Sequence, residues 1–225
     1  MINQKSLLLI TSFLFSSFVH AVNVGSVTTF IYPEQESVSK EIANPTDTAR
    51  LILVSVAKIS SPTEGGEVIS MENGELMLTP SRLLLPANSK NNVRFFYNGP
   101  KDHNERYYRI TWTDMALSEE QGSSSSKSAI ATASAMIGTI LVVSPRIDRF
   151  SYKYFPSSGQ LKNTGNSSYR VVAYGPCINK SSDKKQCKEN YNDMPNKVRQ
   201  FKQVDVQDDN GHVAIWHGDR FISVK

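Results

Sequence analysis

The sequence has little of what enzymes and membrane proteins usually show. After residue 19, no apolar run approaches the roughly 20 residues that a transmembrane helix needs. There is no Gly-x-Ser-x-Gly, no His-Glu-x-x-His and no phosphate-binding glycine loop. These absences predict that the protein is not an enzyme, and that it uses neither a cofactor nor a small-molecule substrate.

Metal ligands and nucleic-acid-binding patches are also scarce. Of the four histidines, His103, His212 and His217 stand far apart in turn-like sequence, so a metal site is not expected. Carboxylates such as Asp114 and Glu119 lie in polar sequence, and we expect them to be solvated. The net charge of +4 comes without a dense block of Lys and Arg, which argues against nucleic acid as a partner.

Residues 1–21 have the three parts of a secretory signal peptide. Lys5 supplies the positive charge, residues 7–19 form a short apolar core, and the sequence Val-His-Ala ends it with a cleavage-like site. An N-terminal membrane anchor is the alternative, but the apolar run is short for one. The sequence therefore predicts cleavage after Ala21 and export to an oxidising compartment.

The chain has only two cysteines, Cys177 and Cys187. In an exported chain, a pair with this short spacing predicts a disulfide that closes a small loop. A metal site would need further ligands, and no other Cys and no His lies nearby in the sequence. Loop entropy predicts that such a bond stabilises the fold by about 2–3 kcal/mol.

Short strand-like runs separated by turn residues fill the chain from residue 22 onwards. Turns at spacings of about ten residues are typical of β-sandwiches, so we predict an all-β protein. The pattern restarts after the Ser-Pro-Arg sequence that ends at Arg146, which favours two sandwich domains, 22–146 and 147–225, over one large domain. Strands are expected at residues 24–32, 37–43, 51–59, 76–79, 81–85, 91–97, 106–113, 129–143, 150–155, 160–163, 169–174, 198–204, 213–216 and 221–224.

The stretch AIATASAMIGTILVV, residues 129–143, is the one around which the rest is organised. Its second half, from residue 139, is apolar on both faces, which predicts a strand buried inside a sheet. The first half is weakly apolar on one face and polar on the other, which predicts an exposed or edge strand. The Ala-rich start also fits a helix, but the β-branched run after it and Pro145 favour a strand. Such a strand suits pairing with another chain.

The segment LMLTPSRLLLPANSKNNVRFFY, residues 76–97, resembles the signature segment of the periplasmic pilus-assembly chaperones of the chaperone–usher pathway. Further motifs follow in the same order over essentially the whole chain after residue 21. In detail the sequence is most similar to the alternate, class 5-like branch of that family. The motifs are Thr79-Pro80, Pro86 and Val93-Arg94 in the first segment, then residues 106–109, 138–146, 163–166 and 174–177.

This resemblance implies an L-shaped pair of immunoglobulin-like β-sandwiches with a cleft between them. Such a chaperone lends its G1 strand to a pilin subunit in the periplasm and delivers the subunit to an outer-membrane usher. Here G1 corresponds to residues 129–143, and the face expected to enter the subunit groove carries Ala131, Ala133, Ala135 and Ile137. Because exposed edges invite self-association, a self-capping homodimer of the free protein is a further expectation.

One departure from the family concerns the anchor for the subunit's C-terminal carboxylate. In better-known branches, an Arg on the first strand and a Lys on G1 form this anchor. Here the corresponding residues are Thr29 and either Gly138 or Ile140. Met136 stands where some relatives carry Arg.

A substitute anchor is therefore expected among the arginines. A guanidinium binds a carboxylate through two parallel hydrogen bonds, and the candidates in this chain are Arg109, Arg106 and Arg146. A solvated surface charge is the alternative interpretation for each of them. Arg94 and Pro145, which belong to the shared motifs, are expected to be structural.

Pilin subunits and carbohydrate-binding adhesins are secreted β-sandwich proteins that fit parts of the sequence. A pilin would begin with a free donor arm and lack a complete second domain, whereas this chain opens on a strand-like segment. An adhesin would show exposed aromatics among polar loops, and Trp216 beside His217 is one candidate. Packing in the core or at a domain interface explains Trp216 more simply, so the chaperone interpretation leads.

Overall fold

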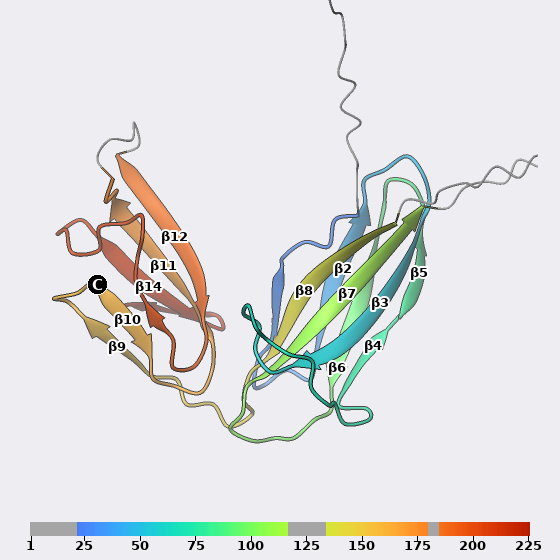
Figure 1. The fold of residues 1–225 in the computed structure, drawn as a ribbon, viewed down its shortest axis with the longest axis horizontal. Coiled ribbons are helices and arrows are strands. Elements are labelled where there is room, and N and C mark those ends of the chain that lie inside the picture. The colour runs from blue at the N-terminus through green and yellow to red at the C-terminus, as the bar shows by residue number, and fades with distance from the viewer. Residues whose placement is uncertain (1–21, 117–133, 180–184) are drawn as a thin grey trace, which may run out of the picture.

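The computed structural model describes residues 22–116, 134–179 and 185–225, and these ranges contain strands and no helix. They accordingly contain no helix that is long and apolar enough to span a membrane. Figure 1 shows two β-sandwiches, inclined to each other and joined at one end by the segment after β8. The prediction of an all-β protein is confirmed.

The first sandwich consists of a five-stranded and a three-stranded sheet, in the orders β1-β8-β7-β3-β5 and β2-β6-β4. Its strands are β1 (Thr28–Ile31), β2 (Ser37–Asn44), β3 (Arg50–Ile59), β4 (Leu76–Thr79), β5 (Arg82–Leu85), β6 (Ser89–Tyr97), β7 (Arg106–Ala116) and β8 (Ser134–Val143). Alternate side chains point into the core between the sheets, where the rings of Trp112 and Phe95 meet edge to face. Trp112 is thus a core residue, as predicted.

The first segment of the chain changes sheets, which the sequence pattern did not predict. Asn23 pairs with Ala43 of β2 in the smaller sheet, and β1 then pairs in parallel with residues 140–143 of β8 in the larger sheet. Between the two lies Gly25, whose φ of 66° lies in the left-handed region that glycine tolerates. The strand expected over residues 24–32 is therefore a short β1 preceded by a separate bridge.

Asp114 is buried, so the expectation that it is solvated was wrong. Its side chain is fully enclosed and forms an ion pair with Arg50, whose Nε lies 2.7 Å from Oδ1. Asp114 shares the inward face of β7 with Ile110 and Trp112, so the alternation of the strand places it in the core. Glu119 lies outside the described residues.

The second sandwich packs the sheet β13-β10-β9 against the sheet β12-β11-β14-β15. Its strands are β9 (Tyr152–Phe155), β10 (Gln160–Asn163), β11 (Tyr169–Pro176), β12 (Gln186–Asp193), β13 (Val198–Arg199), β14 (His212–His217) and β15 (Arg220–Ser223). Cys177 and Cys187 form the predicted disulfide, with their Cα atoms 5.0 Å apart. The bond ties the end of β11 to the start of β12.

The sequence did not predict β12, because polar residues occupy its inward positions. Glu189 is buried and accepts hydrogen bonds from the backbone amides of Lys202, Gln203 and Val204. Asp193 is buried and forms an ion pair with Arg199. These donors belong to residues 199–204, which follow β12 in the sequence. Of the strand expected over residues 198–204, only the two residues of β13 form a strand.

Loops at the joined end hold the two sandwiches together. Asn166 of the second sandwich donates to the carbonyls of His103 and Ile147, at 2.9 Å each. Glu105 of the first sandwich accepts hydrogen bonds from the amide and the hydroxyl of Ser168, at 2.5 Å each. Burial raises the pKa of the Glu105 carboxyl. These contacts set how the sandwiches lie relative to each other.

Candidate functional site

β8 has neighbouring strands on both sides along only part of its length. On one side it pairs with β7 from Ser134 to Val143. On the other side β1 covers residues 140–143, and within the described ranges no strand pairs with residues 134–139. This part of β8 is a free sheet edge, which is a template for another strand.

The backbone amides along the free edge belong to the even-numbered residues. Ile140 donates to the carbonyl of Val27, and Ser144 donates to the carbonyl of Ile31, so both amides point to the β1 side. Because N–H groups alternate between the two sides of a strand, even-numbered residues earlier in β8 point the same way. These residues are Ser134, Met136 and Gly138.

The odd-numbered side chains of β8 face the core of the first sandwich. Thr139 and Leu141 are buried there, and Thr139 accepts a hydrogen bond from the indole N–H of Trp112 at 2.9 Å. Ile137 lies on the same side and packs, half-buried, against this core. The inward face of β8 thus becomes less enclosed toward its N-terminal end.

The residues predicted to enter a subunit groove lie at this less enclosed end. Ala135 and Ile137 are half-buried on the inward face, whereas Met136 on the outer face is 72 % exposed. Ala131 and Ala133 lie outside the described residues.

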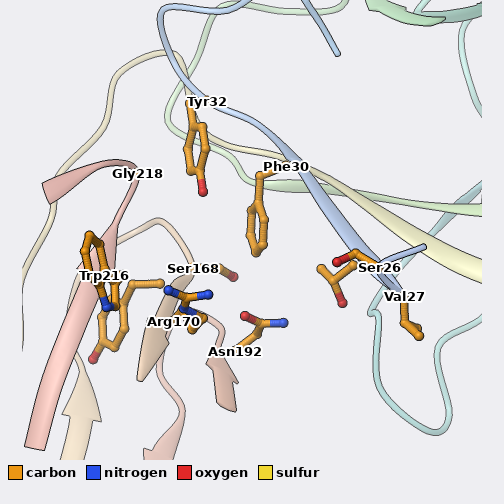
Figure 2. A pocket seen from close by; sticks show the side chains of 11 residues that line it. Ser26, Val27, Phe30, Tyr32, Ser168, Arg170, Asn192, Trp216 and Gly218 are labelled. Carbon is orange, nitrogen blue, oxygen red and sulfur yellow. The ribbon is translucent and has the colours of Figure 1, made fainter. Parts of the chain in front are cut away.

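A cleft of about 460 Å³ opens between the two sandwiches, beside β1 (Figure 2). On one wall the rings of Phe30 and Tyr32 stack at 5.7 Å. On the other wall, the Arg170 guanidinium lies 5.6 Å from the centre of the Trp216 ring. Arg170 was not among the predicted site residues, while Trp216 lies between the sandwiches as expected. The remaining lining residues are Ser26, Val27, Thr28, Ser168, Tyr169, Asn192 and Gly218.

Two of the three predicted anchor arginines already have partners. Arg106 donates to both carboxylate oxygens of Asp102, at 2.7 and 2.8 Å. This hydrogen-bonded pair holds the pKa of the Asp102 carboxyl well below its usual range. The Nη1 atom of Arg146 donates to three backbone carbonyls in the turn between β1 and β2. Both side chains therefore support the local fold.

The Arg109 side chain is exposed and forms no hydrogen bond or ion pair with the part of the chain that the structure describes, whereas its backbone pairs with β3 and β8. It lies on the outer face of the five-stranded sheet, in one row with Ile140 of β8 and Thr28 of β1. Thr28 also lines the cleft. Of the three candidates, Arg109 is thus the one with a guanidinium available to a ligand.

The two residues predicted to be structural lie away from the free edge. Arg94 donates through Nε and Nη2 to the hydroxyl of Ser37 and lies over the ring of Phe96. Pro145 is buried directly after β8, at the start of the segment that leads to the second sandwich.

Lys40 of β2 is a buried cation that the sequence analysis missed. The residue is 7 % exposed, and its Nζ donates to the carbonyl of Ser26 and lies 3.3 Å from Oγ1 of Thr29. Burial lowers the pKa of this ammonium. A signal was present in the sequence, because Lys40 stands between Val38 and Ile42 at the inward positions of a strand.

The described ranges hold no group of three His, Cys, Asp or Glu side chains that could bind a metal ion. Free backbone amides, half-buried apolar side chains and cations are the groups that the site offers. These groups bind another polypeptide by strand pairing and burial.

Comparison with known proteins identifies the family. Residues 150–224 match a family described as the EcpB C-terminal domain. The chain is also 49 % identical over 225 residues to the probable fimbrial chaperones EcpB of Escherichia coli (strain K12) and Shigella boydii serotype 4 (strain Sb227). These alignments cover 99 % of this chain and 100 % of each relative. The chain belongs to the EcpB fimbrial chaperones.

Solved structures of other fimbrial chaperones share the fold. The class 5 fimbriae chaperone CfaA matches with a TM-score of 0.51 and 17 % identity, over 90 % of this chain and 97 % of that chain. The periplasmic chaperone SfaE matches with a TM-score of 0.51 and 13 % identity, over 90 % of this chain and 98 % of that chain. The predicted pair of immunoglobulin-like β-sandwiches is thereby confirmed.

Membership of the EcpB fimbrial chaperones determines the general role of the chain. Fimbrial chaperones are folding and assembly factors rather than enzymes, and those of this family are periplasmic. The chaperone interpretation of the sequence is therefore confirmed over the pilin and adhesin alternatives.

Proposed function

We propose that this fimbrial chaperone binds the pilin subunits of its own fimbria by adding the free edge of β8 to a subunit sheet. In this proposal it then delivers the subunits to an outer-membrane usher. The observation that carries the proposal is the contrast within β8: residues 140–143 have a strand on each side, whereas residues 134–139 have none on one side within the described ranges.

The chemistry of the free edge suits a subunit that lacks a strand. Such a subunit leaves backbone N–H and C=O groups unpaired, and each costs about 1–3 kcal/mol if it is buried without a partner. The free backbone groups of Met136 and Gly138 would pair with them. Ile137 would fill part of the exposed groove and contribute about 1.5–3 kcal/mol.

The small side chains of Ala131, Ala133 and Ala135 would fill the rest of the groove only shallowly. Each buried methyl-sized group contributes about 0.8 kcal/mol, which is less than a larger apolar side chain would give. A better-fitting strand from the next subunit could therefore replace β8. The difference in burial energy between the alanines and larger side chains keeps a bound subunit folded and still transferable to the next subunit.

Further parts of the proposal rest on the sequence pattern and the strand arrangement. Residues 1–21 act as a cleavable signal peptide that directs the chain to the periplasm. The domain boundary lies between Arg146 and Ile147, after the last strand of the first sandwich. The free edge of β8 also pairs with a second copy when no subunit is present, giving a homodimer. Arg109, the one predicted anchor without a partner, takes part in carboxylate binding.

Proline at position 136 tests the strand-addition proposal. Met136→Pro removes an amide that points to the free edge and leaves the ladder with β7 intact, and proline is tolerated on sheet edges. Met136→Ala is the matched control, because it shortens the same side chain and keeps the amide. Wild type and both variants would be co-expressed with the major pilin of the same assembly system and analysed by native mass spectrometry. We expect a 1:1 complex for wild type and Met136→Ala, and none for Met136→Pro.

Circular dichroism of the purified variants would show that each is folded. Equal amounts of complex for wild type and both variants would contradict strand addition at this edge. The absence of a complex between the wild-type chain and any subunit of its assembly system would contradict the proposed function as a whole.

A further inference from the structure

A cavity of about 110 Å³ lies between the two sandwiches, over the outer face of β1 and β8. Its lining is mostly apolar, and the apolar residues are Phe30, Pro62, Ile140, Val142 and Met194. Met194 belongs to the second sandwich, in the segment that follows β12. Four of the lining residues, among them Phe30, also line the larger cleft, so we call this cavity the side pocket of the cleft.

The loop between β3 and β4 forms one wall of the side pocket. The amide of Ser60 donates to the carbonyl of Glu67 at 2.9 Å, so the loop begins as a hairpin. Within the hairpin, a Cβ on Gly66 would lie 2.0 Å from the carbonyl oxygen of Ser61, so only glycine fits there. The hairpin holds Pro62 over the outer face of β8, on the side of the first sandwich that faces the second (Figure 1).

The side pocket lies where the free edge of β8 ends. Because β1 pairs with residues 140–143, a strand added to residues 134–139 cannot continue within the sheet beyond Thr28. On the inward side of the sheet, the buried side chains of Ile31 and Leu141 fill the core. The added chain therefore leaves the sheet on its outer side, where the cleft and the side pocket lie.

The size and the lining of the side pocket define what fits into it. An apolar cavity of about 150 Å³ is large enough to hold benzene, and the side pocket is smaller than that. An aliphatic side chain such as that of valine or leucine fits, whereas an aromatic side chain is too large. An alanine would leave most of the pocket unfilled and would lose the contacts with its walls.

Asn192 places a polar group beside the side pocket. It lines the side pocket as well as the cleft, and Figure 2 shows its side chain across the cleft from Phe30. The residue is half-buried, and its side-chain amide forms no hydrogen bond with the part of the chain that the structure describes. A side-chain amide has two donors and an acceptor, so it can bind both the N–H and the C=O of a passing backbone.

We propose that the side pocket takes one aliphatic side chain of the polypeptide that pairs with β8, while Asn192 binds the backbone next to that side chain. The inference rests on the proposed function and adds to it a subsite that selects among subunit sequences. Pairing through backbone groups depends little on sequence, whereas a pocket for a side chain gives specificity. The side pocket thus favours subunits with a residue of the right size at one position.

Imperfect packing between the sandwiches is the competing explanation for the side pocket. A packing gap is a property of the free chain alone, so filling it would leave the affinity for a subunit unchanged. A subsite that is filled from within the chaperone excludes the subunit side chain and loses affinity. The test therefore fills the pocket in the chaperone and also changes side chains in the subunit.

The experiment uses the full exported chain and the major pilin of its assembly system. Met194→Trp fills the pocket from the second sandwich, away from the free edge of β8. Val198→Trp is the matched control, because it adds the same ring at a residue that is 45 % exposed and lines neither cavity. In the pilin, each aliphatic residue of the strand that pairs with β8 and of its flanking segments is replaced in turn by alanine. Titrations followed by native mass spectrometry give the affinities.

We expect Met194→Trp to weaken the complex by about ten- to a hundredfold, the value of one buried aliphatic side chain. Val198→Trp should bind like wild type, and Asn192→Ala should bind about three- to tenfold more weakly. One pilin alanine should weaken binding to wild type by the same factor as Met194→Trp and have no further effect on that variant, since both changes remove the same contact.

An unchanged affinity of Met194→Trp would overturn the inference, as would losses that multiply at every pilin position. An unchanged affinity of Asn192→Ala would overturn the role of Asn192. If wild type forms no complex with the unaltered pilin, the proposed function itself fails, and the inference fails with it.

A second variant keeps the test decisive if Met194→Trp does not fold. Met194→Ala enlarges the side pocket, and phenylalanine is introduced at each of the scanned pilin positions. At one position, phenylalanine should weaken binding to wild type by about tenfold or more, and Met194→Ala should restore most of this loss. If Met194→Ala relieves the effect of phenylalanine at none of the positions, the side pocket does not hold a subunit side chain.

Discussion

The two halves of β8 differ in what surrounds them, although they form one continuous strand (Figure 1). From Ile140 to Val143 the strand lies between β1 and β7, and Leu141 and Val143 belong to the core. From Ser134 to Thr139 it has β7 on one side and a free edge on the other. The closed half has a neighbouring strand of this chain on each side. On its free edge, the open half would receive a strand from a second polypeptide.

This difference separates what stabilises the fold from what binds a partner. In the closed half, side-chain burial and hydrogen bonds on both sides are already made in the free protein. In the open half, the N–H groups of Met136 and Gly138 and the half-buried side chain of Ile137 keep part of their capacity for interaction. Substitutions in the closed half should therefore affect folding, and substitutions in the open half should affect complex formation.

Truncation of one apolar side chain in each half should give the largest difference. Leu141→Ala removes a fully buried side chain and should lower the free energy of unfolding by about 2–5 kcal/mol. Ile137→Ala removes a half-buried one and should cost about 1 kcal/mol, while weakening the complex with a subunit. Urea denaturation of the free protein measures the first effect, and native mass spectrometry of the complex measures the second. Equal losses of stability would contradict the division of β8 into two halves.

The pH dependence of stability should show a smaller effect, at the contact between the sandwiches beside the closed half. Burial raises the pKa of the Glu105 carboxyl above its ordinary value of 4.5. The folded state then holds this proton more tightly than the unfolded state. The stabilisation is complete below pH 4.5 and is lost as the pH rises through the folded-state value.

Glu105→Gln removes this titration and is the variant that checks it. The difference in unfolding free energy between wild type and Glu105→Gln should change in favour of the variant as the pH rises from 4.5. Urea midpoints at a series of pH values would measure this difference. Two curves that stay parallel over the range would show that Glu105 does not titrate in this way.

Much of this architecture follows from apolar alternation in the sequence. The closed half of β8 is apolar on both faces, and that pattern correctly predicts a strand inside a sheet. The core position of Trp112 and the disulfide between Cys177 and Cys187 were also predicted, because a large aromatic residue on a strand face and an isolated cysteine pair in an exported chain each have one simple explanation.

Polar residues at inward positions account for most of what was missed. Glu189 and Asp193 obscure the alternation of β12, and their partners lie between Arg199 and Val204, in the segment that follows this strand. Asp114 was expected to be solvated, and no role was predicted for Lys40. Both stand at inward positions of otherwise apolar strand faces. Sequence alternation alone could have placed them in the core, but their partners depend on the tertiary arrangement.

Arg170 and the cleft show a second limit of the sequence. The cleft is lined by residues of both sandwiches, and its shape depends on the contacts that Glu105 and Asn166 make between them. No local pattern marks Arg170 as a cleft residue, because its placement results from the orientation of one domain relative to the other.

Hydrogen exchange along β8 tests the central claim most directly. In the free protein, the amides of Met136 and Gly138 should exchange rapidly, whereas the amide of Ile140, which donates to Val27, should be protected. On binding the major pilin of the same assembly system, the first two amides should become protected as well. Protection of Met136 and Gly138 in the monomeric free protein, or rapid exchange that persists in the complex, would contradict strand addition at the open half of β8.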